Sequence, residues 1–177
     1  MVILLVIAAV IVLLVAVVAT RPSDFRVTRS TAISAPPAVV FAQVNDFHNW
    51  DGWSPWARMD SEMKATYAGP AAGTGAVYSW VGNNKVGEGR MTIMESHPSD
   101  LVRIKLEFIK PFAATNTAEF TFQPQGNQTT VTWNMTGKKN FMTKAMGLVM
   151  NMDKMVGGQF DQGLAQMKSV AETAAKK

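Results

Sequence analysis

Hydrophobic and polar positions along the chain fall into three patterns, of which the first is a continuous apolar run. The first nineteen residues, MVILLVIAAVIVLLVAVVA, contain no polar side chain. A helix of that length covers about 28 Å, close to the thickness of a bilayer's hydrocarbon core, and it satisfies its own backbone in lipid. The run predicts a transmembrane anchor helix over residues 1–20, followed by a linker over residues 21–24 in which Pro22 ends the helix.

The second pattern is an alternation of apolar and polar residues, which predicts β-strands. In LVRIKLEF (101–108) the even positions are apolar, whereas Arg103, Lys105 and Glu107 occupy odd positions. Such a sheet has one dry face and one wet face. Short breaks such as PQGN (124–127) favour hairpins and therefore an antiparallel meander. The predicted strands are residues 25–33, 75–82, 86–96, 101–108, 114–124 and 129–137.

Short helical segments separate the first predicted strand from the others. Two prolines open a short helix in SAPPAVVFAQVND. The stretch FHNWDGWSPWARMD then carries three of the chain's five tryptophans. Asp46 is well placed to cap a second short helix, on which Trp50 and Trp53 share a face. We expect this helix to end at Pro55, before Trp56.

The third pattern is an apolar spacing of three and four residues from Asn140 to Ala175, which predicts one long amphipathic helix. Six of the chain's twelve methionines lie in this segment. Gly147, Gly157, Gly158 and Gly163 would each weaken an isolated helix by up to about 1 kcal/mol relative to alanine. We therefore expect the helix backbone to pack closely on another surface.

This order of elements, with the residues in it, resembles the START-like superfamily, also called SRPBCC or Bet v 1-like. The stretches that carry the resemblance are STAISAPPAVVFAQVNDFHNWDGWSPW, GAVYSWVGN, VGEGRMTI, ATNTAEFTF and MDKMVGGQFDQGLAQMK. They look closest to the small bacterial "polyketide cyclase/dehydrase and lipid transport" proteins. The resemblance implies an α+β helix-grip domain over residues 25–177, in which a curved antiparallel sheet wraps a long C-terminal helix around an apolar cavity.

The resemblance does not imply a reaction. Members of the superfamily include lipid carriers, cyclases, hydrolase-like regulators and proteins with no known ligand. In the family, the element that corresponds to the tryptophan-rich stretch closes one end of the cavity. We therefore interpret this stretch as a lid and core corner.

Charge is unevenly distributed along the chain. The net charge is +4, and residues 138–177 account for the whole excess with seven lysines and three acidic residues. These lysines are spread along a helical segment, so they form either a solvated face or a face near anionic lipid headgroups. A clustered basic stripe, which is typical of nucleic-acid-binding proteins, is missing, and we predict no nucleic-acid partner.

Candidate catalytic chemistry is sparse in this sequence. The chain has no cysteine, which excludes thiolate catalysis. It has two histidines, and no catalytic triad can be proposed around either of them. No spacing singles out a metal site, and AGPAAGTGA (68–76) lacks the lysine of a phosphate-binding loop. We predict no catalytic residue, no metal and no cofactor. If the protein is an enzyme, His48, Tyr78 and Arg90 are the candidate polar groups.

Aromatic and methionine side chains are the remaining candidates for a site. Ligand sites are mostly apolar, and methionine suits an adaptable pocket. The same residues would also build an ordinary core, and the sequence leaves both interpretations open. The predicted cavity-lining residues are Trp53, Trp56, Tyr78, Trp80, Met91, Phe108, Phe120, Trp133, Met152 and Met155.

Three functions follow from these features. The first is a membrane-anchored, non-catalytic module that binds a hydrophobic small molecule or lipid. The alternatives are an accessory subunit of a multi-subunit membrane complex and a cyclase- or dehydratase-type enzyme. Arg21, Arg26 and Arg29 follow the span, so the positive-inside rule places the domain on the cytoplasmic side of a single-pass cell-membrane protein. A cleaved signal peptide fits less well, because a charged segment before the apolar run is missing and the run exceeds the usual length of roughly 7–15 residues.

Overall fold

A computed structural model describes residues 2–148 and 151–176, without the side chain of Met152. Its helices are α1 (Val2–Thr20), α2 (Pro37–Asn45), α3 (Phe141–Met146) and α4 (Met152–Ala174), with two 3₁₀ turns, η1 (Phe47–Gly52) and η2 (Pro55–Arg58). Its strands are β1 (Asp24–Ile33), β2 (Lys64–Ala68), β3 (Val77–Val81), β4 (Glu88–His97), β5 (Leu101–Lys110), β6 (Ala114–Gln125) and β7 (Gln128–Lys138).

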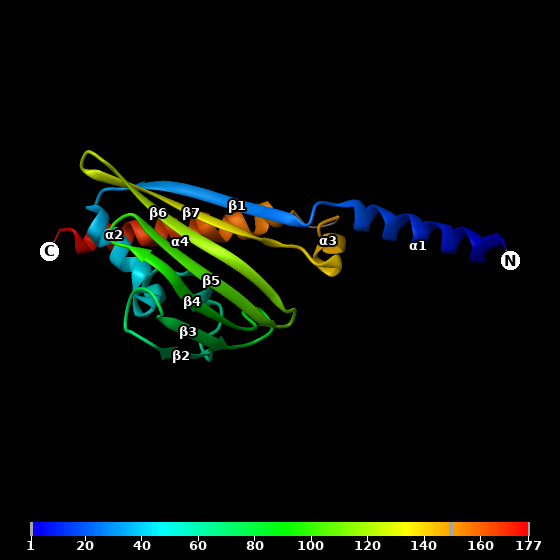
Figure 1. Cartoon of the computed structure of the whole chain (residues 1–177), viewed down its shortest axis with the longest axis horizontal. Coiled ribbons are helices and arrows are strands. Elements are labelled where there is room, and N and C mark those ends of the chain that lie inside the picture. The colour runs from blue at the N-terminus through cyan, green and yellow to red at the C-terminus, as the bar shows by residue number, and fades with distance from the viewer. Residues whose placement is uncertain (1, 149–150, 177) are drawn as a thin grey trace.

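The strands form a single curved sheet that wraps around α4 (Figure 1). Their order is β1-β7-β6-β5-β4-β3-β2, and every neighbouring pair is antiparallel. Hairpins join strands β2 to β7 in sequence order, whereas β1 pairs with the last strand, β7. The predicted α+β helix-grip fold is confirmed, with β1 and β2 at the two edges of the sheet and α4 in contact with β1.

The hydrophobic core lies between the concave face of the sheet, α4 and the short helices after β1. Successive strand residues point to opposite faces, so the apolar residues that alternate with polar ones lie together on the concave face. On β5, Val102 and Ile104 are fully buried, while Leu106 and Phe108 on the same parity are partly buried. The matching face of α4 consists of Phe160, Leu164 and Met167, and each lies about one helical turn from the next.

The structure contains an edge strand that the sequence pattern does not predict. All five residues of β2 are exposed, and its sequence, KATYA, has no apolar alternation. A strand that buries neither face gives no periodic signal, so β2 is recognisable only through its pairing with β3.

The prediction of one helix from Asn140 to Ala175 is wrong, because this segment contains two helices. Asn140 caps α3 by accepting a hydrogen bond from the Thr143 amide, and α3 ends at Met146 with Gly147 as its C-cap. Asn151 then caps α4 by accepting from the Lys154 amide. The two asparagine caps and the glycine favour separate helices, since asparagine caps well and glycine propagates poorly.

Helix α1 is long and apolar enough to cross a bilayer, the one helix of the described residues with these properties. A signal sequence near the N-terminus can meet the same criterion of length and hydropathy. Nearly all its side chains are exposed, and Val18 is the exception. The helix projects from the end of the domain at which it contacts α3 (Figure 1).

Candidate ligand-binding cavity

The tryptophan-rich corner is built by two consecutive 3₁₀ turns. The Asp46 side chain accepts a hydrogen bond from the His48 amide and caps η1, as the sequence predicts. Pro55 opens η2 instead of simply ending a helix, because proline suits the first position of a helical turn. A helical turn therefore includes Trp56, which was expected to lie beyond the end of the helix.

Two of the three tryptophans in this corner are core residues with satisfied donors. Trp50 Nε1 donates to the Val44 carbonyl at 3.0 Å, and Trp53 Nε1 donates to the Gln43 carbonyl at 2.9 Å. Trp53 is fully buried. Because a buried indole without a partner would cost free energy, these two bonds allow α2 and η1 to pack as one unit.

Trp133 on β7 links this corner to α4. Its ring stacks on Phe160 with a centroid separation of 3.9 Å and an interplanar angle of 6°. Trp56 meets the same indole edge-on at 5.8 Å, and Phe120 stacks on it at 4.8 Å. Each such aromatic pair adds about 0.5–1.5 kcal/mol beyond area burial. The cluster fixes the relative positions of sheet, turn and helix on one side of a cavity.

The cavity lies between this cluster, the concave face of β3 to β7 and the early turns of α4. Its volume is about 230 Å³, below the roughly 300–1,000 Å³ typical of small-molecule sites. A cavity of this volume has room for a small apolar molecule or for one end of a larger one. The lining residues are Trp50, Asp51, Ser54, Trp56, Ala57, Met63, Tyr78, Trp80, Lys85, Val86, Met91, Leu106, Phe108, Ala118, Trp133, Met135, Val156 and Phe160.

Few polar groups line the cavity. Burial, followed by the nearby Tyr67 and Asp51, raises the pKa of Tyr78 to about 12. The Tyr78 hydroxyl therefore keeps its proton at neutral pH and can donate a hydrogen bond. Trp133 Nε1 is buried and has no hydrogen-bond partner among the described residues. Both groups are donors. Asp51, Ser54 and Lys85 are the other polar residues of the wall, and the rest of it is apolar.

The predicted site residues divide between cavity wall, core and surface. Trp53 and Phe120 lie in the core and are absent from the wall. Met155 is 46% exposed and lies outside the cavity, and the side chain of Met152 is outside the described residues. The structure brings together Trp56, Tyr78, Trp80, Met91, Phe108 and Trp133. That these six side chains contact a ligand remains a prediction.

Some residues of the cavity wall were not predicted from the sequence, although the alternation along their strands marks them. Leu106 shares the parity of Phe108, Ala118 that of Phe120, and Met135 that of Trp133. Extending the choice along each strand by two residues would have found them. No periodic signal marks Met63 or Lys85, because both lie in connecting segments.

Of the three candidate polar groups, Tyr78 alone lies on the cavity wall. His48 Nδ1 lies 2.7 Å from an Asp46 oxygen, and its imidazole stacks on Tyr67. Arg90 points to the exposed face of β4, as its parity predicts. Among the described residues no group of three or more His, Asp or Glu side chains is arranged to hold a metal ion.

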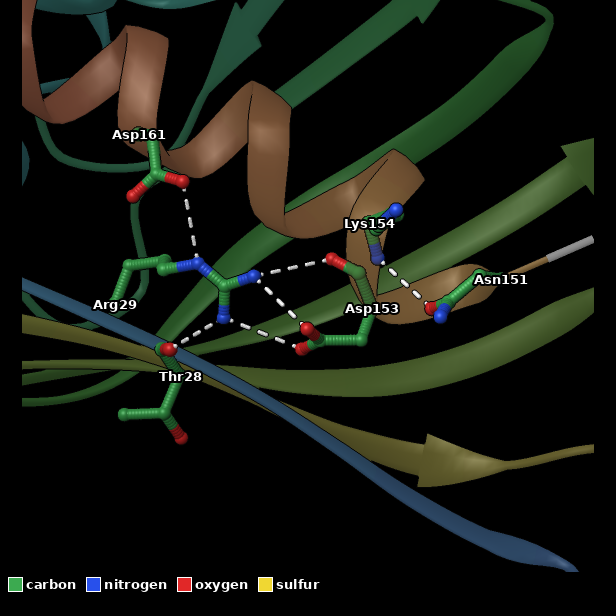
Figure 2. A network of polar contacts seen from close by, with 6 residues as sticks. All are labelled: Thr28, Arg29, Asn151, Asp153, Lys154 and Asp161. Atoms are coloured by element: carbon green, nitrogen blue, oxygen red, sulfur yellow. Dashed lines mark hydrogen bonds and ion pairs between the residues drawn. The ribbon is translucent and has the colours of Figure 1, made fainter.

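A polar network fastens the early turns of α4, which carry the wall residues Val156 and Phe160, to β1 (Figure 2). Arg29 lies at its centre, with its guanidinium 3.0 Å from Asp153 Oδ2 and 3.2 Å from Asp161 Oδ2. It also donates to the Asp153 and Thr28 carbonyls. We call Arg29, Asp153 and Asp161 the α4 latch, because they hold the helical side of the cavity against the sheet.

Because Gly157 has no side chain, it leaves space for the Arg29 guanidinium of the α4 latch. Alanine substitutions at Gly157 and at the adjacent Gly158 should therefore differ in their effect on stability. A Cβ at position 157 would overlap the Arg29 guanidinium, whereas a Cβ at position 158 meets nothing within 4 Å. Gly158→Ala should raise the free energy of unfolding by up to about 1 kcal/mol through helix propensity. Gly157→Ala gains the same helix propensity but displaces Arg29, so its melting temperature should lie several degrees below that of Gly158→Ala. Equal melting temperatures of the two variants in detergent would contradict this role.

The latch also predicts a dependence of stability on pH. The hydrogen bond from Arg29 lowers the pKa of Asp153 below its ordinary value of 3.8. Since the folded-state pKa is below the unfolded-state value, the latch stabilises the fold above about pH 4 and loses this contribution as the pH falls through the folded pKa. The gap in melting temperature between wild type and Arg29→Gln should therefore be constant from about pH 7 to 5 and close at lower pH. A gap that stays unchanged to about pH 2.5 would exclude the carboxylate as its source.

Sheet, long C-terminal helix and apolar cavity together define a helix-grip protein. The family model described as "Polyketide cyclase / dehydrase and lipid transport" matches residues 24–172, and the chain belongs to this family.

Solved structures share this fold at low sequence identity. CV1439 from Chromobacterium violaceum is 15% identical with a TM-score of 0.60, over 86% of this chain and 99% of that chain. The Aha1 dimer from Colwellia psychrerythraea is 14% identical with a TM-score of 0.60, over 84% and 96%. The di-domain ARO/CYC StfQ from the steffimycin biosynthetic pathway is 10% identical with a TM-score of 0.63, over 88% and 53%. A comparison with curated proteins finds no match.

Proposed function

We propose that this protein is a membrane-anchored, non-catalytic module that binds a hydrophobic small molecule, or the apolar end of a lipid, in the cavity beneath the tryptophan-rich corner. The observation that carries the proposal is the cavity of about 230 Å³ with its aromatic and methionine wall. Apolar cavities with few polar groups favour apolar ligands. The family description, which includes lipid transport, supports the same ligand class.

The anchoring part of the proposal is carried by α1. All of its residues before Thr20 are apolar, and their side chains are exposed along almost the whole helix. Such a surface is stable in hydrocarbon and costly in water. In this proposal α1 spans the membrane once and tethers the domain at the surface, where an apolar ligand partitions.

The non-catalytic part of the proposal rests on the distribution of polar groups. Acid–base catalysis needs a titratable side chain within hydrogen-bond reach of the reacting atoms. His48 and Arg90 lie away from the cavity wall, and the titratable wall residues Asp51 and Lys85 are exposed to solvent. Tyr78 remains as a hydrogen-bond donor, and we assign it the role of orienting a polar atom of the ligand.

Contact quenching of tryptophan fluorescence tests the binding proposal. All five tryptophans lie outside α1, and Trp50, Trp56, Trp80 and Trp133 line the cavity. We expect ω-bromopalmitic acid to quench the purified full chain in a saturable manner, and unbrominated palmitic acid to reverse the quenching. Insertion of α1 into detergent gives no such signal. Absence of saturable quenching across brominated fatty acids, sterols and isoprenoids would contradict the proposal.

A further inference from the structure

The short helix α3 is held beside the point where α1 meets the domain. The Lys139 amide donates to the Ser23 carbonyl at 2.6 Å, and Asp24 pairs with Lys138 at the end of the β1–β7 ladder. Helix α3 begins two residues later and contacts α1 (Figure 1). Val18, in the last turns of α1, is buried at 4% exposure. Backbone pairing therefore fixes α3 at one end of α1.

Exposed apolar side chains gather on and after α3. Phe141 and Met142 are each 53% exposed, and Leu148 is 39% exposed. Single exposed apolar residues are common, but a group of large ones marks a surface that contacts a membrane or another protein. None of the three lines the cavity described above.

Basic residues lie beside this apolar group in the sequence and at the end of α1. Lys138, Lys139 and Lys144 lie on and before α3, and Arg21 follows α1 directly. None of these four forms an ion pair within residues 2–148 and 151–176. Apolar side chains flanked by lysines are typical of helices that lie in a bilayer interface, with the ammonium groups at the level of anionic headgroups.

We propose that α3 is a second membrane contact, which places Phe141 and Met142 in the interface of an anionic leaflet while Lys138, Lys139 and Lys144 bind lipid phosphate and carboxylate groups. The inference rests on the proposed anchoring by α1. Two observations favour a bilayer over a protein partner. The charge complements anionic headgroups, and the contact with α1 puts α3 at the level where the span leaves the hydrocarbon.

This contact would fix the orientation of the domain as well as its position. Helix α4 begins six residues after α3 ends, and Val156 in its second turn lines the cavity. With α3 in the interface, the beginning of the helical cavity wall stands close to the lipid surface. A flexible tether after α1 would leave that wall free to face any direction.

A single introduced cysteine can report the environment of α3, because the natural chain has none. Met142→Cys, labelled with the environment-sensitive fluorophore NBD, would be reconstituted as the full chain into phosphatidylcholine vesicles with or without phosphatidylserine. We expect a blue-shifted emission with phosphatidylserine, quenching by lipids that carry a nitroxide near the headgroup, and reversal by high salt. Asn127→Cys, in the β6–β7 turn at the opposite end of the domain, is the matched control and should remain water-like (Figure 1).

Charge removal provides the second arm of the test. Each lysine near an anionic surface strengthens binding by about fivefold, so Lys138→Gln, Lys139→Gln and Lys144→Gln together should abolish the dependence on phosphatidylserine. A water-like Met142→Cys label on protein that floats with the vesicles would overturn this inference alone. Protein that fails to float would overturn the anchor and, with it, this inference. A label that is shielded only in native membranes would overturn it in favour of a protein partner.

Discussion

Replacing Ala118 with phenylalanine is expected to abolish ligand binding while leaving the protein folded. Ala118 lies on β6 in the cavity wall, opposite Met135 on β7, and it is 4% exposed. A benzyl group at this position would enter the cavity and occupy the space proposed for the ligand. We expect the affinity for ω-bromopalmitic acid, measured by tryptophan quenching, to fall about tenfold or more, which corresponds to at least about 1.4 kcal/mol.

The stability of the Ala118→Phe variant separates a cavity from a closely packed core. Filling an existing cavity typically raises the free energy of unfolding by about 0.5–2 kcal/mol. Forcing extra atoms into a packed core lowers it by about 1–3 kcal/mol. Thr117→Phe adds the same group on the exposed face of the same strand and should leave affinity unchanged. A destabilised Ala118→Phe protein that retains affinity would refute the assignment of this wall.

Replacing Trp53 with alanine is expected to cause the largest loss of stability of any tryptophan substitution in the corner. Trp53 is fully buried, packs edge-on against Phe120 and Trp133, and bonds to the Gln43 carbonyl. Truncating a buried tryptophan costs about 3–5 kcal/mol. That is a large part of a typical total stability of about 5–15 kcal/mol, so the melting temperature should fall steeply.

Trp56→Ala is the matched comparison, because Trp56 is three residues away but partly exposed on the cavity wall. We expect it to weaken binding of the brominated fatty acid and to lower the melting temperature much less than Trp53→Ala. Calorimetric melts together with quenching titrations measure both effects. If Trp53→Ala melts no lower than Trp56→Ala, the division of this corner into core and wall is incorrect.

The face that each strand residue occupies could be predicted from sequence, because strand geometry has a period of two. Val102 and Leu106 share a parity, and the structure places both on the concave face. Whether a residue on that face lies in the packed core or on the cavity wall could not be predicted. Val102 lies in the packed core whereas Leu106 lines the cavity, and the difference depends on where α4 crosses the sheet.

The helical part of the site was harder to predict. Met155 and Val156 are adjacent, yet Met155 is largely exposed and Val156 lines the cavity. Their orientations follow from the phase of α4, and that phase is set by the Asn151 cap and the Arg29 contact. A single continuous helix from Asn140 does not include the new helix start at Asn151. The prediction from sequence therefore placed Met155 in the site, whereas the structure places it outside the cavity.

Native mass spectrometry of the full chain, extracted in mild detergent and incubated with a panel of fatty acids, isoprenoids and phospholipids, tests the central claim most directly. The account predicts that wild-type protein retains one apolar molecule per chain and that Ala118→Phe does not. Wild-type protein that retains none, or Ala118→Phe that retains the same molecule equally well, would contradict it.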